Sequence, residues 1–327
     1  MSDDREQVVP SVVVRVARPE HPVAAVADDD EARRGTAYPA VRAGGPLFGH
    51  AADLGDGRWR VHSVEEDTPQ AARDALAHRL RKRLAMSTDA MLAAELAAVG
   101  QVLDWEKVNE VTVAGRRHRV VRADTFARFS EDGPEPPRPS DPDTGTGGQS
   151  RDEGVVVDPG SVTGPAQALT RVELLTAYYP SARVPAEVYA DSVAAIRSHP
   201  DGVLLPTEYA VSELVGGGWE PVSHHHASPQ AARDQLCFKF RYMMPRFGQL
   251  GEEEIAAYGR AADKVDATRA NEVTVLGRRF RVTRVIALLR FGMDGPEPPR
   301  ASDYDPEPPP EAHFSDLRAR GLLPEPQ

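Results

Sequence analysis

Apolar residues return at every fourth position in two stretches of the chain, which predicts two amphipathic helices. One stretch follows Thr68-Pro69 and the other follows Ser228-Pro229. Ser or Thr accepts a hydrogen bond from the free N–H groups of a first helical turn, and proline fits the next position because its missing N–H would lack a partner there. Both helices should begin at the proline. Their buried stripes are expected to be Ala72, Leu76, Leu80 and Leu84 in one, and Ala232, Leu236, Phe240 and Met244 in the other.

Further along, the pattern changes to an alternation of period two, which predicts strands. Residues 110–113 alternate polar and apolar up to Ala114-Gly115, which fits a two-residue turn, and residues 272–275 do so up to Leu276-Gly277. In such a hairpin, residues paired across the strands share a face. Val111, His118 and Val120 are therefore expected to face the core. Two cross-strand ion pairs are predicted, Glu110–Arg119 and Glu272–Arg281.

Two blocks of this region occur twice, at a constant spacing of 162 residues. Residues 109–120 return as 271–282 with ten of twelve identical, and residues 132–141 return as 294–303 with nine of ten identical. Such identity indicates an internal duplication. The second block contains Gly-Pro-Glu-Pro-Pro-Arg, expected to be a stiff strap across its own domain, or alternatively a polyproline II ligand for a partner's groove.

These patterns predict an α+β fold of two tandem homologous repeats, each an antiparallel sheet packed against helices, with the repeats paired by a pseudo-two-fold axis. Further helices are expected near 28–42, 89–103, 185–198 and 252–265, and further strands near 11–16, 169–177, 203–215 and 218–223. The expected division is a flexible N-terminus at 1–10, repeat 1 at 11–141, a flexible linker at 142–164, repeat 2 at 165–303 and a Pro-rich acidic tail at 304–327.

Composition narrows the classes of protein to consider. The 327 residues carry a net charge of −11, which disfavours unspecific binding of nucleic acid by the whole surface. Cys237 is the only cysteine, so an intrachain disulfide and a multi-cysteine zinc site are excluded. The charged start lacks a signal peptide's apolar region, and no apolar run is long enough to span a bilayer. We expect a cytoplasmic protein without membrane contact.

Three motifs together resemble an uncharacterised family of actinobacterial proteins. They are Ser/Thr-Pro-Gln-Ala-Ala-Arg-Asp, Val-Thr-Val-x-Gly-Arg-Arg and Gly-Pro-Glu-Pro-Pro-Arg-x-Ser-Asp, and the likeness covers most of the chain. The resemblance implies a bacterial cytoplasmic setting and supplies no catalytic residues.

Common catalytic motifs are missing from the sequence. It contains no phosphate-binding Gly-x-x-x-x-Gly-Lys-Ser/Thr, no His-Glu-x-x-His and no Gly-x-Ser-x-Gly. No histidine is kept in both copies, which excludes a histidine mechanism shared by them but leaves room for one active half. The unmatched pairs are His62 and Val222, His78 and Phe238, and His118 and Phe280. Weak candidate metal ligands are His224, His226, Asp303 and Asp305.

Duplicated arginines beside the hairpin turns are the main candidates for binding. Arg116, Arg117, Arg278 and Arg279 have no partner visible in the sequence and could hold a phosphate or nucleic-acid backbone. Ion pairing with the carboxylates of the proline blocks is the structural alternative. Three functions are considered: a non-enzymatic interaction or accessory protein, favoured by the missing motifs; an anion or nucleic-acid binder; and a metal-assisted enzyme with one active half. No cofactor is expected.

Overall fold

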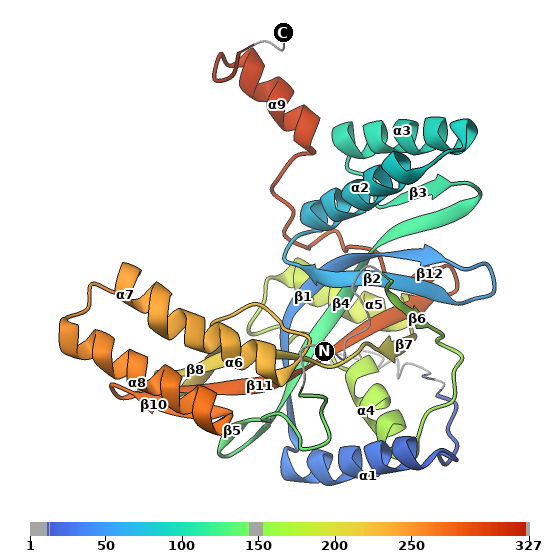
Figure 1. Ribbon diagram of the computed structural model, residues 1–327. Coiled ribbons are helices and arrows are strands. Elements are labelled where there is room, and N and C mark those ends of the chain that lie inside the picture. The colour runs from blue at the N-terminus through green and yellow to red at the C-terminus, as the bar shows by residue number, and fades with distance from the viewer. Residues whose placement is uncertain (1–11, 13, 144–152, 325–327) are drawn as a thin grey trace, which may run out of the picture.

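The computed structural model describes residue 12, residues 14–143 and residues 153–324 (Figure 1). We call residues 14–143 the first half and residues 153–324 the second half. The N-terminal segment 1–10 and residues 144–152 of the expected linker lie outside the described residues. Elements of the first half are α1 (Pro22–Ala37), β1 (Ala40–Asp53), β2 (Trp59–Glu66), α2 (Pro69–Met86), α3 (Ala90–Trp105), β3 (Glu110–Val113), β4 (Arg116–Ser130) and β5 (Gly133–Pro134).

The second half begins with a short strand and ends with a helix. Its elements are β6 (Val155–Val157), α4 (Pro165–Leu175), α5 (Ala186–Ser198), β7 (Asp201–Leu204), β8 (Glu208–Val215), β9 (Gly218–Pro221), α6 (Pro229–Phe238), the π-helical turn η1 (Lys239–Met243), α7 (Met244–Phe247), α8 (Glu252–Thr268), β10 (Glu272–Val275), β11 (Arg278–Gly292), β12 (Gly295–Pro296) and α9 (Pro310–Ala319).

The fold is α+β, and its strands join in one curled antiparallel sheet instead of a separate sheet in each half. The order along the sheet is β6-β2-β1-β4-β11-β8-β9, with shorter strands beside β4 and β11. The long strands β4 and β11 cross at the centre, where Thr125 pairs with Ala287 and Phe126 pairs with Ile286. This central pairing connects the two halves through the backbone.

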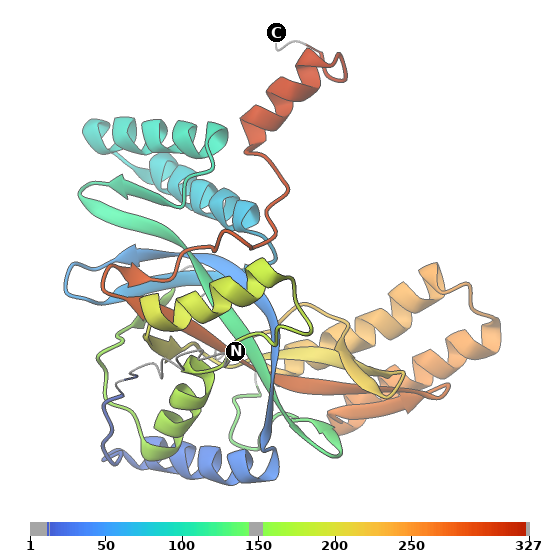
Figure 2. The same ribbon diagram turned by 180° about the vertical axis from the view of Figure 1, so that it is seen from behind.

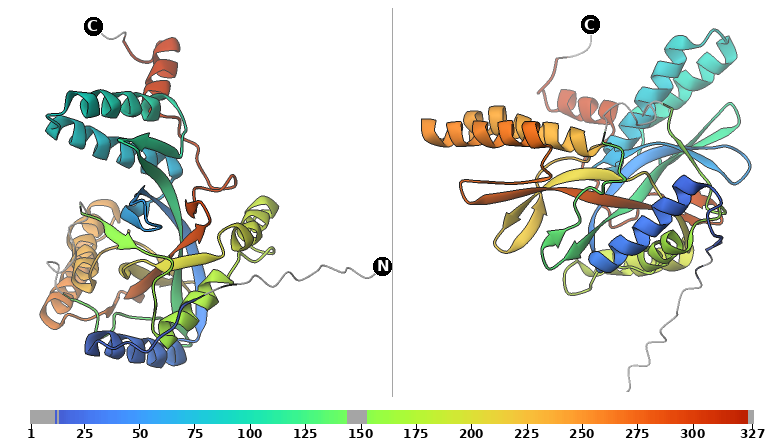
Figure 3. Two further views of the ribbon diagram at one scale, coloured as in Figure 1. Left: turned by 90° about the vertical axis from the view of Figure 1, so that its right-hand side faces the viewer. Right: turned by 60° about the horizontal axis from the view of Figure 1, so that its bottom comes forward.

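Helices cover the sheet in separate groups (Figures 1 and 2). The pair α2 and α3 lies over one end of the sheet, and α6 to α8 extend from the opposite end. Each group packs a core against its own hairpin: Leu76 and Leu80 lie with Val120 in the first half, and Phe240 lies with Phe280 in the second. Figure 3 shows that the two hairpins point away from each other.

The local rules for helix starts and hairpins are confirmed. Thr68 and Ser228 each accept a hydrogen bond from the third residue of their helix, Ala71 or Ala231, at 3.2 Å. Both hairpins have the expected register, and the turn residues Ala114 and Leu276 take positive φ values of 51° and 49°. The expected ion pairs form as well, with Arg119 Nε 2.6 Å from Glu110 and Arg281 Nε 2.7 Å from Glu272.

Several expected elements are wrong. The strand expected at 169–177 is the helix α4, because Gly164-Pro165 is a helix start. Its buried residues Thr170, Arg171, Leu174 and Leu175 recur at the spacing of one helix face. The helix expected at 28–42 begins earlier and gives way to β1 at Ala40.

The segment around the expected linker also differs from expectation. Of the strand expected at 11–16, the described residues show only a bridge from Val16 to Thr163. The part of the linker after residue 152 includes β6, which pairs with β2; its three valines favour a strand. The Pro-rich tail contains the helix α9.

The proline blocks are residues 132–141 and 294–303. Each block crosses to the opposite half, which corrects the expectation of a strap across its own domain. The carbonyl of Glu135 accepts the N–H of Arg284 at 2.9 Å, and the carbonyl of Glu297 accepts the N–H of Arg122 at 2.9 Å. The side chain of Asp303 then binds Arg122 at 3.0 Å. The block of the first half therefore binds β11, and the block of the second half binds β4.

Candidate functional site

Three buried histidines lie side by side on the face of the sheet that α2 covers. His50 is on β1, His62 on β2 and His118 on β4, and the pairs His50↔Val120 and Ala52↔His118 place two of them on adjacent strands. The rings of His50 and His62 stack with their centroids 5.4 Å apart. The exposed fractions are 4%, 8% and 5% for His50, His62 and His118.

These imidazoles are short of hydrogen bonds. Among the described residues, neither ring nitrogen of His50 or His118 has a partner, and Nδ1 of His62 has none. Burial, followed by the neighbouring charge of His62, lowers the pKa of His50 to about 3. Burial and then Arg83 and Arg116 lower the pKa of His118 to about 4, and burial lowers the pKa of His62 to about 4 as well. All three rings are therefore neutral at pH 7.

The second half fills the corresponding positions with apolar side chains. Val211 pairs with Val282 as His50 pairs with Val120, and Phe280 faces Val273 as His118 faces Val111. Val211, Phe280 and Val222 belong to one hydrophobic cluster. A buried polar group without a partner costs about 1–3 kcal/mol, so three histidines at positions that accept Val and Phe require a reason other than packing.

A cavity of about 430 Å³ opens beside His62 and His118, and its lining is strongly cationic. The side chains of α2 and the hairpin converge on it, with exposed residues such as Lys82 and Met86 at its rim. Among the residues that the structure describes, no Asp or Glu lines it. The five cationic residues that line it are Arg60, Arg79, Lys82, Arg83 and Arg116.

A second cavity, of about 410 Å³, adjoins the first and has a mixed lining. The side chains of His62, Arg79 and Lys82 line both cavities, so the two are neighbours. Its other polar side chains are His50, Ser63, Glu65, Glu66, Asp74 and His78. We call the two cavities together the histidine–arginine cleft.

The four arginines singled out in the sequence do not gather in one place, because the two hairpins lie at opposite ends of the sheet (Figure 3). Arg278 binds Glu213 through two nitrogens at 2.6 and 2.8 Å, and Arg279 binds Glu272 at 2.5 Å.

In the first hairpin, Arg116 and Arg117 lie on opposite faces of the sheet. Arg117 binds Asp294 at 2.8 Å and lies over the ring of Trp59. Arg116 points to the other face of the sheet and lines the histidine–arginine cleft. Of the four candidates, Arg116 is the one that the structure places in a cavity.

Two of the weak metal candidates have side-chain partners: Asp303 binds Arg122, and Asp305 binds Arg73 and Lys107. The backbone of His226 pairs with Tyr209. His224 lies two residues before His226 in the same segment. Within the described part of the chain, no three His, Cys, Asp or Glu side chains are placed to hold a metal ion.

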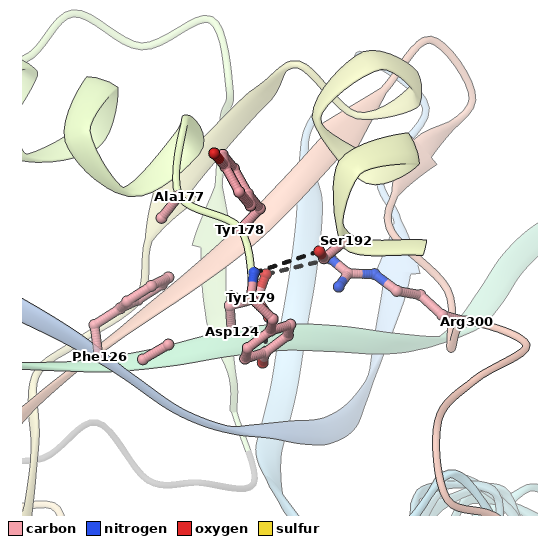
Figure 4. Close-up of a pocket in the computed structure, with 8 residues that line it drawn as sticks. Asp124, Phe126, Ala177, Tyr178, Tyr179, Ser192 and Arg300 are labelled. Atoms are coloured by element: carbon pink, nitrogen blue, oxygen red, sulfur yellow. Dashed lines mark hydrogen bonds and ion pairs between the residues drawn. The ribbon is translucent and has the colours of Figure 1, made fainter. Parts of the chain in front are cut away.

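A further hollow lies beside the central strands, between Asp124, Tyr179 and Arg300 (Figure 4). Its volume of about 10 Å³ has room for about one water molecule. Asp124 already binds Arg122 at 2.6 Å, Tyr179 at 3.1 Å and Arg300 at 3.3 Å. This hollow is therefore part of the buried ion network and too small for a ligand.

Sequence reasoning missed most of the cleft. The run Arg79-Leu80-Arg81-Lys82-Arg83 is an ordinary charged helix end by itself. The signal in the sequence is that Val222 and Phe280 occupy, in the second half, the positions that correspond to His62 and His118. The first half therefore has polar side chains where the second half has apolar ones.

The comparisons with known proteins identify a family but no activity. The model of DUF5954, a family of unknown function, matches residues 21–306. The chain belongs to this family. No curated protein and no solved structure matches the chain. In the described parts of this DUF5954 protein, every helix is too short or too polar to cross a membrane.

Proposed function

We propose that the protein is a non-enzymatic anion-binding protein whose site is the histidine–arginine cleft. The accessory and anion-binding roles are those expected from the sequence. The proposed binding site, however, lies in the first half alone and not on the paired hairpins. The observation that carries it is the cavity lined by five cations and no described carboxylate, in a chain of net charge −11.

The lining favours a compact anion over a polynucleotide. The cavity is concave and within the usual size range of small-molecule sites, whereas the whole surface carries an excess of negative charge that repels nucleic acid. Guanidinium groups bind phosphate and carboxylate oxygens with two parallel hydrogen bonds. A phosphate-bearing small molecule fits this chemistry best.

The proposed site also bears on the duplication expected from the sequence. We infer that the two halves descend from one unit, and that the first half carries a polar site where the second carries a core. The support is the matched register of β1 with β4 and of β8 with β11. A phenylalanine should then be accepted at position 118 as it is at position 280, which the unfolding of His118→Phe measures.

Calorimetric titration with inorganic phosphate tests the binding site. Arg83→Gln should weaken phosphate binding about tenfold, because a charge-assisted hydrogen bond is worth about 1.5–3 kcal/mol and 1.4 kcal/mol is a factor of ten. Arg81→Gln is the matched control. Arg81 is on the same helix, but it binds Asp104 and does not line the cavity.

Two results would contradict the proposal. One is wild-type protein that takes up neither inorganic phosphate nor phosphate esters at low salt. The other is an equal loss of affinity in Arg83→Gln and Arg81→Gln, which would indicate general attraction by the helix and not a site. Raised salt should weaken binding, since mobile ions screen the exposed rim of the cleft.

A further inference from the structure

The second cavity of the histidine–arginine cleft has hydrogen-bonding groups of the opposite kind from the first. Glu66 and Asp74 are half-buried there, and burial raises the pKa of both carboxyl groups. Ser63 adds a hydroxyl from β2. A second phosphate is disfavoured in such surroundings, because it would face carboxylates. Hydroxyl groups suit them, because they donate to a carboxylate.

Buried His50 is a separate indication that this cavity takes a ligand. Its ring lines the cavity, is nine-tenths or more buried, and has no hydrogen-bond partner at either nitrogen among the described residues. Neutral imidazole has one donor and one acceptor nitrogen. A ligand hydroxyl can serve either of them, whereas the dianion of a phosphate monoester can only accept.

The two cavities follow each other along α2. Asp74 lies in the first third of the helix and Arg83 near its end, and a rise of about 1.5 Å per residue separates them by about 14 Å along the axis. His62, Arg79 and Lys82 line both cavities. A ligand that reaches past these three side chains would contact both cavities.

We propose that the cleft binds a phosphate monoester of a polyhydroxylated molecule, such as a sugar phosphate. Its phosphate lies among Arg79, Arg83 and Arg116, and its hydroxyl-bearing body lies between His50, Glu66 and Asp74. This inference rests on the proposed anion binding and adds the class of ligand.

Calorimetric titration of the full-length chain with two probes, inorganic phosphate and ribose 5-phosphate, measures the contribution of the body. Wild-type protein should bind ribose 5-phosphate at least tenfold more tightly than inorganic phosphate. Glu66→Gln and Asp74→Asn should reduce this preference to threefold or less while they leave the affinity for inorganic phosphate within about twofold. Asp67→Asn is the matched control, because Asp67 is adjacent to Glu66 in sequence, exposed, and outside the lining of the cavity.

The results separate the two proposals. Equal affinity of wild-type protein for both probes overturns the sugar phosphate and leaves anion binding intact. A preference that survives in both Glu66→Gln and Asp74→Asn also overturns it, since the hydroxyl contacts would lie elsewhere. Absence of binding of either probe overturns anion binding itself. Unchanged thermal unfolding of the variants in the absence of ligand keeps a folding defect from being taken for a lost contact.

Discussion

Three histidines occupy positions where the other half of the molecule carries Val211, Val222 and Phe280. Their burial without partners destabilises the free protein, because a desolvated polar atom has lost its hydrogen bonds to water. A bound ligand would supply those hydrogen bonds. If the proposed ligand binds, occupancy of the cleft should therefore stabilise the fold.

Their titration gives a pH dependence with a defined sign. The pKa is about 3 for His50 and about 4 for His62 and His118, against 6.5 for an unperturbed histidine. Between these values the unfolded chain binds more protons than the native one, so the free energy of unfolding falls as the pH falls from 6.5 towards 4. From about pH 7.5 to about pH 5, each histidine should remove about 2 kcal/mol.

His118→Phe should be at least as stable as wild type at about pH 7.5 and should lose about 2 kcal/mol less on acidification to about pH 5. Urea unfolding at the two pH values measures this difference. His78→Phe is the control, because His78 is exposed and its position in the other half also carries phenylalanine, Phe238. The same reduction in His78→Phe would contradict the assignment to the buried cluster.

Among the elements, the proline blocks depend on a close approach between the halves. Gly295 has φ +121°, and a Cβ atom there would lie 2.6 Å from the ring of Trp59. Gly133 is placed in the same way against Trp219, with φ +118°. Glycine is required at both turns because a side chain would separate the block from the tryptophan that it covers.

Gly295→Ala should therefore destabilise the protein by about 3 kcal/mol or more, through backbone strain and overlap with Trp59. Gly277→Ala should cost only about 1–2 kcal/mol, because Gly277 also has positive φ but meets no atom within 4 Å of an added Cβ. Thermal and urea unfolding of both variants measure the difference. Equal losses would show that Trp59 gives way and that the contact contributes little.

The sequence predicts those features of helices and strands that depend on residues close together in the chain. The Thr68 and Ser228 helix starts and the hairpin registers follow from neighbouring residues, and they are confirmed. The sequence does not predict β1, because Gly44, Gly45 and Pro46 disfavour a strand. Gly49 is needed in β1 because an added Cβ would meet the backbone of Ser63, and this approach arises only once β2 is paired.

In the whole molecule, the candidate site depends on pairings that local sequence does not specify. His50 and His118 meet because β1 pairs with β4, and α2 must cover both strands before Arg83 reaches the histidine–arginine cleft. Composition pointed away from a cationic site, since the chain is acidic overall. The hairpin arginines were visible in the sequence, but the carboxylates that bind Arg117 and Arg278 come from distant strands and loops.

The same long-range pairings predict that the two halves unfold together. Asp303 of the second half is buried against Arg122 of the first, and removal of one partner from a buried pair costs about 3–5 kcal/mol. In hydrogen exchange with peptide-level detection, Asp303→Ala should lower the protection of β4 and β11 by the same free energy. Asp294→Ala should change both by less than about 1 kcal/mol, because Asp294 is largely exposed and its pairs with Arg117 and Arg119 are screened by water. Loss of protection confined to one half in Asp303→Ala would show instead that each half is stable by itself and that the shared sheet only joins them.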